Sequence, residues 1–271
     1  ESSIFIDMYP GSHVIVDHYG LDCQWESNIN CESMTVIDDL ANRHHKCSLL
    51  IDQSLKNTKL NYENLVDGNF DFIGGDLVIL REEFSNERTW KPHGSGKVLI
   101  CMGGADPKSY TKKILENIIL NHKRCTNPRD VIEINVIVGS AYIDYDDLKS
   151  LADTDKLKVS ILFNPKNISQ LMLQSDLCIL SCGTMILEAC ALGVPSIGVA
   201  VADNQKNTAE FLAKSGAIEL YDFSNEKDRG IYEVILDFIN NPERLSLCSK
   251  KLKTMVSSDA TEIIARRLCE S

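Results

Sequence analysis

The feature that most constrains the fold of this 271-residue chain is a regular alternation of apolar strands and helices in its second half. From Lys97 onward, short apolar runs typical of buried strands are separated by segments with helical periodicity. Because the connections are short, successive strands are expected to lie parallel in one sheet with helices packed on it. The sequence therefore predicts an α/β fold with a doubly wound parallel sheet.

The predicted elements of this half follow one another without long loops. Strands are expected within 97–104, 131–139, 156–163, 176–181, 195–199 and 217–220, and helices at 108–121, 144–152, 167–174, 184–192, 204–215 and within 227–269, where Pro242 begins a helix. Ligands of such sheets bind at the carboxyl ends of the strands. The turns that follow these strands are therefore the candidate functional segments.

The first half contains fewer elements of the same kind. Strands are expected in HVIVDH (13–18), SMTVIDDL (33–40) and CSLLIDQ (47–53). Half of a nucleotide-binding fold needs more than this, so we expect an N-terminal portion upstream of residue 1. Charged residues, Pro and Gly replace the apolar pattern in 81–97, which predicts a domain boundary there.

Composition narrows the classes of function. The net charge of −11 and the pI near 5.0 argue against a nucleic-acid partner, whose phosphates such a surface would repel. No apolar run reaches the roughly 18 residues of a membrane span, and no signal peptide is recognisable. The ten cysteines include no CxxC pair and no cluster with histidine at zinc spacing, which is typical of core thiols in a reducing cytoplasm. Asp38 and Asp39 end a strand without an evident third ligand, so we expect no metal and no cofactor.

A small-residue turn near residue 181 has the character of a diphosphate site. Ser181, Cys182, Gly183 and Thr184 join a strand to an apolar helix, so backbone N–H groups at the helix start can approach an anion closely. One turn further on, Glu188 is the single carboxylate on a helix that is apolar nearly all round. It is therefore expected to face a partner, and ribose hydroxyls suit it, although a solvent-facing position is the alternative.

Two further segments add to this interpretation. Gly103 and Gly104 follow a strand and can present N–H groups to the same anion while Asp106 caps the next helix, although a tight turn alone would explain them. Asn204 and Gln205 begin a helix, where helix capping and recognition of sugar hydroxyl or acetamido groups are both possible.

Six segments, taken in order, are similar to a known enzyme family. They are VIVDHYGLD, TVIDDLANRHHKCSLLIDQ, LVILREEF, CMGGADPK, SCGTMILEA and NQKNTAEFLAKSGA. Their series resembles the UDP-sugar hydrolases of pseudaminic acid biosynthesis, which are related to the glycosyltransferase that adds N-acetylglucosamine in peptidoglycan synthesis. The resemblance covers essentially the whole chain. It implies a GT-B-like fold with two Rossmann-like, doubly wound domains facing a cleft, the N-terminal one incomplete.

The resemblance also implies an activity and a set of roles. We expect hydrolysis of UDP-2,4-diacetamido-2,4,6-trideoxy-β-L-altropyranose to free sugar and UDP, with inversion at C1 and without a metal. Residues 1–90 would be the sugar and catalytic side, and residues 91–271 the UDP-binding domain. Backbone near Leu162 and Phe163 would hold uracil, Glu188 the ribose and the glycine turns the diphosphate, while Tyr19 and Asn204 would lie near the sugar as catalytic residues. The partner is the UDP-sugar, bound by a monomer.

One family motif has no counterpart in this sequence. The family carries a water-activating histidine in a Gly-x-Gly-His loop, and neither His13 nor His18 lies in such a loop. We therefore expect the general base upstream of residue 1. Without the family resemblance, His18 and Tyr19 would be interpreted as structural residues. Two alternatives stay open: a GT-B glycosyltransferase that uses a UDP-sugar donor, and a UDP-binding fragment without activity.

Overall fold

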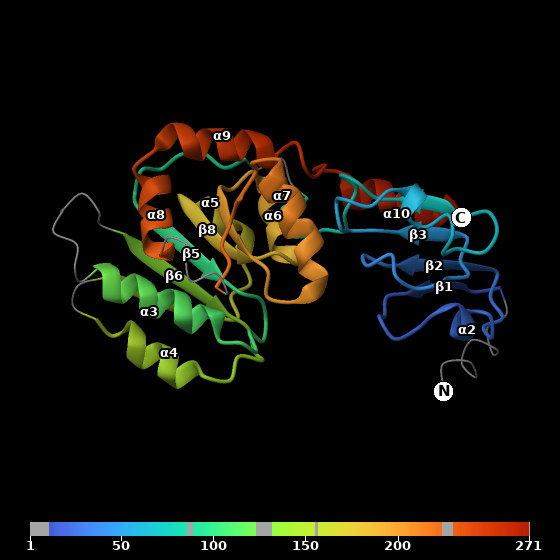
Figure 1. Cartoon of the computed structure of the whole chain (residues 1–271), viewed down its shortest axis with the longest axis horizontal. Helices are drawn as coiled ribbons and strands as arrows, with labels where there is room; N and C mark the ends of the chain where they lie inside the picture. Colours follow the sequence, from blue (N-terminus) through green and yellow to red (C-terminus); the bar gives the residue numbers. More distant parts are fainter. Residues whose placement is uncertain (1–10, 86–88, 123–131, 155–156, 224–229, 271) are drawn as a thin grey trace. The chain divides into compact units, whose positions relative to one another are not determined.

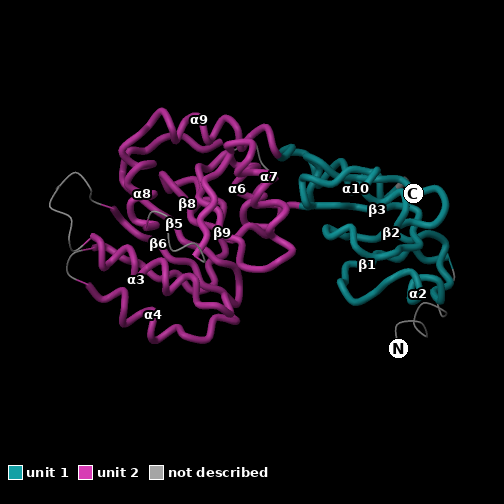
Figure 2. The backbone as a smooth tube through the Cα atoms, viewed as in Figure 1, with its two compact units in different colours: residues 1–79, 256–271 teal, residues 80–255 magenta. Residues whose placement is uncertain are grey.

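The computed structural model describes residues 11–85, 89–122, 132–154, 157–223 and 230–270. The chain forms two compact units (Figure 2), one made of residues 1–79 and 256–271 and the other of residues 80–255. They are called the first and the second unit below.

The first unit is built on a parallel sheet of four strands in the order β1-β2-β3-β4. Its elements are β1 (His13–Val16), α2 (Cys23–Glu26), β2 (Ser33–Ile37), β3 (Leu49–Ile51), η1 (Lys59–Asn61), β4 (Asp71–Ile73) and, after residue 255, α10 (Ala260–Glu270). The strands pair in register with Val16 opposite Val36 and Leu50 opposite Phe72. Both faces of β3 are buried, which explains its unbroken apolar sequence.

Helix α10 covers part of this sheet although it lies at the other end of the chain. Ile264 and Leu268 pack with Leu49, Ile51 and Ile73 in one apolar cluster. The chain therefore passes from the first unit to the second at 79–80 and returns to the first at 255–256. The sequence analysis predicts a single boundary at 90–91. The difference has a physical cause, because the apolar face of α10 finds its partners on strands about 200 residues away.

The second unit contains a parallel sheet of six strands in the order β10-β9-β8-β5-β6-β7. Its strands are β5 (Lys97–Cys101), β6 (Glu133–Val138), β7 (Lys158–Phe163), β8 (Leu177–Ser181), β9 (Ser196–Val199) and β10 (Glu219–Leu220). Its helices are η2 (Glu82–Phe84), α3 (Tyr110–His122), α4 (Tyr145–Ala152), α5 (Ile168–Leu173), α6 (Thr184–Leu192), η3 (Asp203–Gln205), α7 (Lys206–Lys214), α8 (Ile231–Ile239) and α9 (Pro242–Leu252). Figure 1 shows helices α3 to α9 arranged around the sheet.

The strand order reverses between β5 and β8. The chain runs outward from β5 through β6 to β7 and then returns to β8, from which it runs the other way to β9 and β10. Ligands of such sheets bind at this switch point, outside the carboxyl ends of the strands. Both central strands are almost wholly buried, so only the turns that follow them are accessible there.

Most of the predicted elements are confirmed. The structure contains a strand or helix within or overlapping each predicted range, α6 has the predicted bounds, and Pro242 is the first residue of α9. The doubly wound, Rossmann-like character of the fold is confirmed as well. Strand β4 and helix α2 were not expected, and both are very short.

Candidate functional site

A cavity of about 680 Å³ opens in the second unit at the carboxyl ends of β5, β6 and β8. The turns after these strands line it, together with Asn164 after β7 and the start of α6. The predicted site residues that line it are Gly103, Gly104, Ser181, Gly183, Thr184, Glu188, Asn204 and Gln205. The structure thus brings the two glycine turns, the helix start and the amide pair around one space at the switch point.

The first turn is fixed by the helix that follows it and by a close backbone approach. Asp106 is buried and its carboxylate accepts the N–H groups of Tyr110 at 2.9 Å and Thr111 at 2.7 Å, so it caps α3 as expected. Gly139 packs directly on this turn, since a Cβ at Gly139 would lie 2.6 Å from the carbonyl oxygen of Gly104. The backbone of residues 103–106 therefore has little freedom to move.

The second turn leaves the N–H groups of Thr184 and Met185 without a side-chain cap, while that of Ile186 donates to the carbonyl oxygen of Gly183 at 3.3 Å. Gly183 precedes the helix, and no side chain caps the first turn. Such N–H groups need a partner, and an anion placed there also gains from the helix dipole. Gln205 closes one side, because a Cβ at Gly183 would lie 3.1 Å from its Nε2 atom, and its Oε1 accepts the N–H of Val201 at 3.1 Å.

Glu188 is bound by Arg81 in a bidentate ion pair. Arg81 Nε donates to Oε1 at 2.7 Å, and Nη2 donates to Oε2 at 3.0 Å. The Glu188 side chain is 1% exposed, whereas that of Arg81 is 48% exposed and also lies 3.3 Å from Glu83. Burial raises the pKa of Glu188 while Arg81 opposes the shift, and the hydrogen bond to Glu188 raises the pKa of Arg81.

Arg81 is the residue that the sequence analysis missed. It is the single cation among the described residues that line the cavity, and the two carboxylates there, Asp106 and Glu188, already have partners. Its guanidinium carbon lies 4.9 Å from the ring centre of Phe84, which belongs to η2. In the sequence, Arg81 belongs to the LVILREEF segment that carries the family resemblance and begins the charged stretch 81–97 that predicts a boundary, and neither pattern indicates a ligand. The cavity thus has uncapped N–H groups and a fixed cation, which suit a diphosphate.

The other predicted site residues lie outside this cavity. Leu162 and Phe163 end β7, and the next residue, Asn164, is the one that lines the cavity. Phe163 is largely exposed, and its ring lies 5.4 Å from that of Tyr145. Backbone contact of Leu162 and Phe163 with uracil stays a prediction.

Tyr19 belongs to the first unit, at the carboxyl end of β1. Its ring is 55% exposed, its hydroxyl donates to Asp39 Oδ2 at 3.0 Å, and the Arg43 guanidinium lies 5.7 Å from the ring centre. Burial raises the pKa of Asp39, and the hydrogen bond from Tyr19 opposes that shift. Within the described residues, no group of three or more His, Cys, Asp or Glu side chains is placed to hold a metal ion.

The described cysteines form no disulfide, and those of the strands and of α6 are buried. In particular, burial raises the pKa of Cys101 to about 11 and of Cys182 to about 12, so these thiols stay protonated near neutral pH. Cys125 lies outside the described residues. Among the helices that the structure describes, none has the length and apolar character needed to cross a bilayer.

The fold and the cavity define a class, that of proteins built on a Rossmann-like parallel sheet with a cavity at the switch point of the strand order. Comparison with known families gives the particular one: residues 98–264 match the glycosyltransferase family 28 C-terminal domain, and the chain belongs to this family. The match covers most of the second unit and continues into α10.

Curated relatives include both hydrolases and transferases. The chain is 28% identical over 207 residues to the UDP-2,4-diacetamido-2,4,6-trideoxy-beta-L-altropyranose hydrolase of Campylobacter jejuni, which covers 75% of this chain and 71% of that protein. It is 25% identical over 202 residues to the UDP-N-acetylglucosamine–N-acetylmuramyl-(pentapeptide) pyrophosphoryl-undecaprenol N-acetylglucosamine transferase of Acetivibrio thermocellus, covering 71% of this chain and 53% of that protein. The chain therefore spans only about half the length of the second relative.

Solved structures support the fold. Acinetobacter baumannii MurG aligns with a TM-score of 0.60 and 15% identity, covering 92% of this chain and 76% of that one. The spinosyn rhamnosyltransferase SpnG complexed with thymidine diphosphate aligns with a TM-score of 0.56 and 14% identity. The alignment covers 86% of this chain and 67% of that one. These likenesses confirm the expected GT-B-like fold family, and at such identities they carry the fold alone.

Proposed function

We propose that this chain binds a UDP-linked sugar in the cavity at the switch point and takes part in its hydrolysis to free sugar and UDP. The observation that carries the proposal is the convergence of two glycine turns, the uncapped start of α6 and Arg81 on one space. A protein with a net charge of −11 repels anions in general, so a diphosphate needs local donors of this kind.

The site offers a part for each portion of the nucleotide. Backbone N–H groups at the start of α6 and in the 103–104 turn would hold the diphosphate, and Arg81 would add a positive charge. Each carboxylate oxygen of Glu188 accepts one hydrogen bond from Arg81, which keeps the guanidinium oriented. The remaining lone pairs of the two oxygens would accept hydrogen bonds from the ribose hydroxyls. Backbone at the end of β7 would take uracil.

The proposed reaction is a displacement at C1 of the sugar. A water oxygen forms a bond to C1, the bond from C1 to the diphosphate oxygen breaks with its electrons, and the water proton is released as UDP departs with inversion at C1. The donors around the diphosphate would stabilise the charge that develops on the leaving group. Tyr19 and Asn204 would position the sugar and the water. Asp106 and Glu188 are already bonded to N–H groups and Arg81, so neither is the proposed base.

Hydrolysis is favoured over transfer by the relative from Campylobacter jejuni and by the DHYG and IDDLA segments of the first unit. Transfer of the sugar to an acceptor is the second candidate, because the transferase relatives share the family. Both reactions use the same donor cavity. They differ in whether an acceptor is needed.

The test is to incubate the purified chain with the UDP-linked 2,4-diacetamido-2,4,6-trideoxy sugar and to follow UDP release with and without an acceptor. Release without an acceptor is expected for hydrolysis, and release only with one would favour transfer. Calorimetry with UDP alone measures whether the chain binds the nucleotide, which tests the fragment interpretation. Binding without release would support the fragment interpretation, and no binding of UDP would overturn the proposal.

A further inference from the structure

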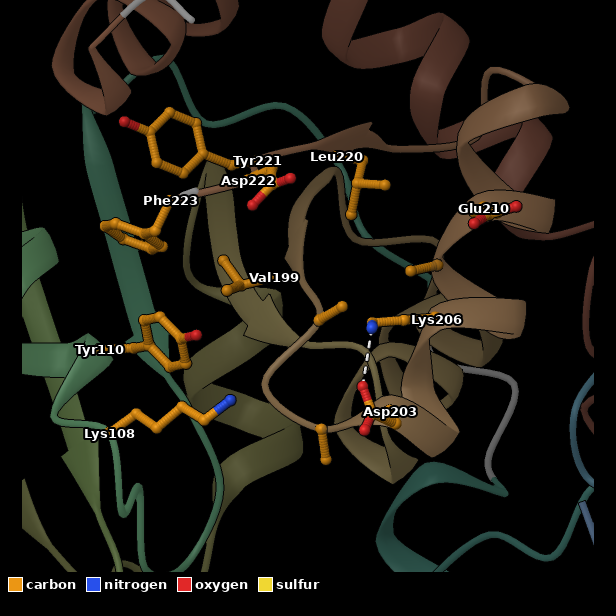
Figure 3. Close-up of a pocket in the computed structure, with 13 residues that line it drawn as sticks. Lys108, Tyr110, Val199, Asp203, Lys206, Glu210, Leu220, Tyr221, Asp222 and Phe223 are labelled. Atoms are coloured by element: carbon orange, nitrogen blue, oxygen red, sulfur yellow. Dashed lines mark ion pairs between the residues drawn. The ribbon is translucent and has the colours of Figure 1, made fainter. Parts of the chain in front are cut away.

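A second cavity lies in the second unit at the carboxyl ends of β9 and β10. Its volume is about 430 Å³, and it shares no lining residue with the cavity at the switch point. Figure 3 shows side chains from three segments directed toward it: the start of α3, the segment from the end of β9 to α7, and residues 220–223. We call it the β9–β10 cavity.

Two short segments separate the two cavities. In each segment, some residues line the switch-point cavity and others line the β9–β10 cavity. In the segment before α3, Pro107 lines the switch-point cavity and Lys108 lines the β9–β10 cavity. At η3, Asn204 lines the first, whereas Asp203 and Lys206 line the second. The β9–β10 cavity is therefore a neighbouring space with its own lining, and we expect a ligand there to leave the switch-point cavity open.

Three aromatic rings form a concave corner on one side of the β9–β10 cavity. The rings of Tyr110 and Phe223 lie 5.1 Å apart at 35°, and those of Tyr221 and Phe223 lie 4.9 Å apart at 82°. All three rings are only partly buried and line the cavity (Figure 3). Because two of them are nearly perpendicular, they offer a ring face and a ring edge to one ligand.

The opposite wall is polar, and its charges are largely balanced. Lys206 Nζ lies 2.7 Å from Asp203 Oδ1, and Glu210 is paired at 3.2 Å with Lys214 on the next turn of α7. Lys108 and Asp222 also line the cavity with one positive and one negative charge. The lining carries two ammonium groups and three carboxylates, one of which is paired with Lys214, so a ligand with a net charge gains little net attraction here. A neutral ligand with several hydroxyl groups can instead donate to the carboxylates and accept from the ammonium groups without breaking the pairs.

We propose that the β9–β10 cavity binds a neutral pyranose. The volume lies in the range of small-molecule sites, and the lining combines an apolar aromatic surface with convergent donors and acceptors. The C–H groups of one sugar face would pack on the corner formed by Tyr110, Tyr221 and Phe223. The ring hydroxyls would bond to the charged wall. This inference stands apart from the proposed function, because it needs neither UDP nor a reaction.

The test is ligand-observed saturation-transfer NMR with glucose, galactose and N-acetylglucosamine on the folded chain. At least one pyranose is expected to bind with a dissociation constant on the order of 1 mM, and saturating UDP should leave its signal unchanged. Glucuronate and glucosamine serve as charged comparators and should bind more weakly. A signal abolished by UDP, a stronger signal from a charged comparator, or no signal from any pyranose would overturn the proposal.

Variants locate the binding. Tyr110→Ala and Phe223→Ala each remove part of the aromatic corner, and each should weaken pyranose binding by about tenfold. Phe211→Ala is the matched control, because Phe211 is an exposed ring on α7 that does not line the cavity, and it should leave binding unchanged. Thermal unfolding shows that each variant is folded. Equal losses in all three variants would contradict the assignment, while UDP affinity measured separately reports on the other cavity.

Discussion

The carboxyl edges of the two sheets are built in contrasting ways. In the second unit, two glycine turns and the start of α6, which has no side-chain cap, line a cavity. In the first unit, the same edge is occupied by buried carboxylates that already have partners: Asp38 and Asp52 are both 1% exposed, and the Tyr62 hydroxyl donates between them. The edge of the second unit suits an anion, whereas that of the first unit is acidic and mostly bonded internally, with one buried oxygen, Asp39 Oδ1, that has no hydrogen-bond partner among the described residues.

The contrast indicates where affinity for a diphosphate resides. The backbone N–H groups of these turns and Arg81 all belong to the second unit, so UDP affinity should depend on residues 80–255. The carboxylates of the first unit would repel a diphosphate and contribute instead to the stability of that unit. Burial and the neighbouring carboxylates raise the pKa of Tyr62, which keeps its hydroxyl protonated as a donor.

The largest expected effect is on the stability of the first unit. Asp38 accepts hydrogen bonds from Ala41 N–H at 2.9 Å and from Arg43 at 2.5 Å, so Asp38→Ala leaves buried donors without a partner. Breaking such a buried ion pair costs about 3 to 5 kcal/mol of unfolding free energy. Trp25 lies in the first unit and Trp90 in the second, so urea unfolding followed in the Trp90→Phe background reports the first unit alone.

UDP affinity should be unchanged in the same Asp38→Ala protein at low denaturant, because the proposed nucleotide site lies wholly in the second unit. Asp38→Asn, which retains an acceptor, should lose less stability. A large fall in UDP affinity without unfolding would break the comparison.

The next effect sharpens the role of Arg81 in the second unit. Removing a charged hydrogen-bond partner of a phosphate typically costs about 1.5 to 3 kcal/mol, so Arg81→Ala should weaken UDP binding by roughly 10- to 100-fold. Glu188→Ala should weaken it by about 1 to 3 kcal/mol, because both its carboxylate oxygens hold Arg81. Calorimetry on the two single variants and the double variant measures how far these losses overlap.

Because Glu188 orients Arg81, we expect the double variant to lose clearly less than the sum of the single losses. Strict additivity would mean that the two side chains act independently. Lys112→Ala is the matched control, since Lys112 forms an exposed ion pair with Asp147 at 2.9 Å away from the cavity, and UDP affinity should be unaffected.

A smaller effect is expected where the glycine turn is held in place. The Gly139→Ala substitution would put a Cβ 2.6 Å from the backbone oxygen of Gly104, so the turn must shift. We expect this shift to lower the unfolding free energy by about 1 to 2 kcal/mol. UDP affinity should fall with it. Gly104→Ala is the control for stability, because a Cβ there has no atom within 4 Å, and an equal loss in both variants would show that packing at Gly139 is not the cause.

These residues also show how far sequence alone could go. Helix α6 was predicted with its bounds because an apolar helical run follows the small-residue turn at 181–184, and in the structure Gly193 ends it in the left-handed conformation. The two turns were found because strand, glycine and helix follow one another locally. The pairing of Arg81 with Glu188 was not predictable, because it joins residues 107 positions apart. The contact of α10 with the first sheet was not predictable for the same reason, because it also joins residues far apart in the sequence.

The smallest expected effect is an opposite pH dependence of one carboxylate in each unit. Asp176, in the second unit, is buried, which raises its pKa, but hydrogen bonds from Ser95 and from the N–H groups of His93, Gly94 and Lys97 outweigh this and lower it overall. Its contribution to stability is therefore present above the ordinary aspartate pKa and is lost as the pH falls through its lower folded value.

Asp39, in the first unit, has a raised pKa because of its burial, so its contribution is greatest below the ordinary value and is lost as the pH rises through the folded pKa. Urea unfolding between about pH 3 and pH 7 checks both, with Trp90 reporting Asp176→Asn and Trp25 reporting Asp39→Asn. The loss caused by Asp176→Asn should grow as the pH rises, whereas Asp39→Asn should become relatively more stable over the same range. Parallel curves for the two variants would mean that the surroundings of Asp176, which precedes β8, and of Asp39, which follows β2, do not shift the pKa values of the two carboxyl groups in opposite directions.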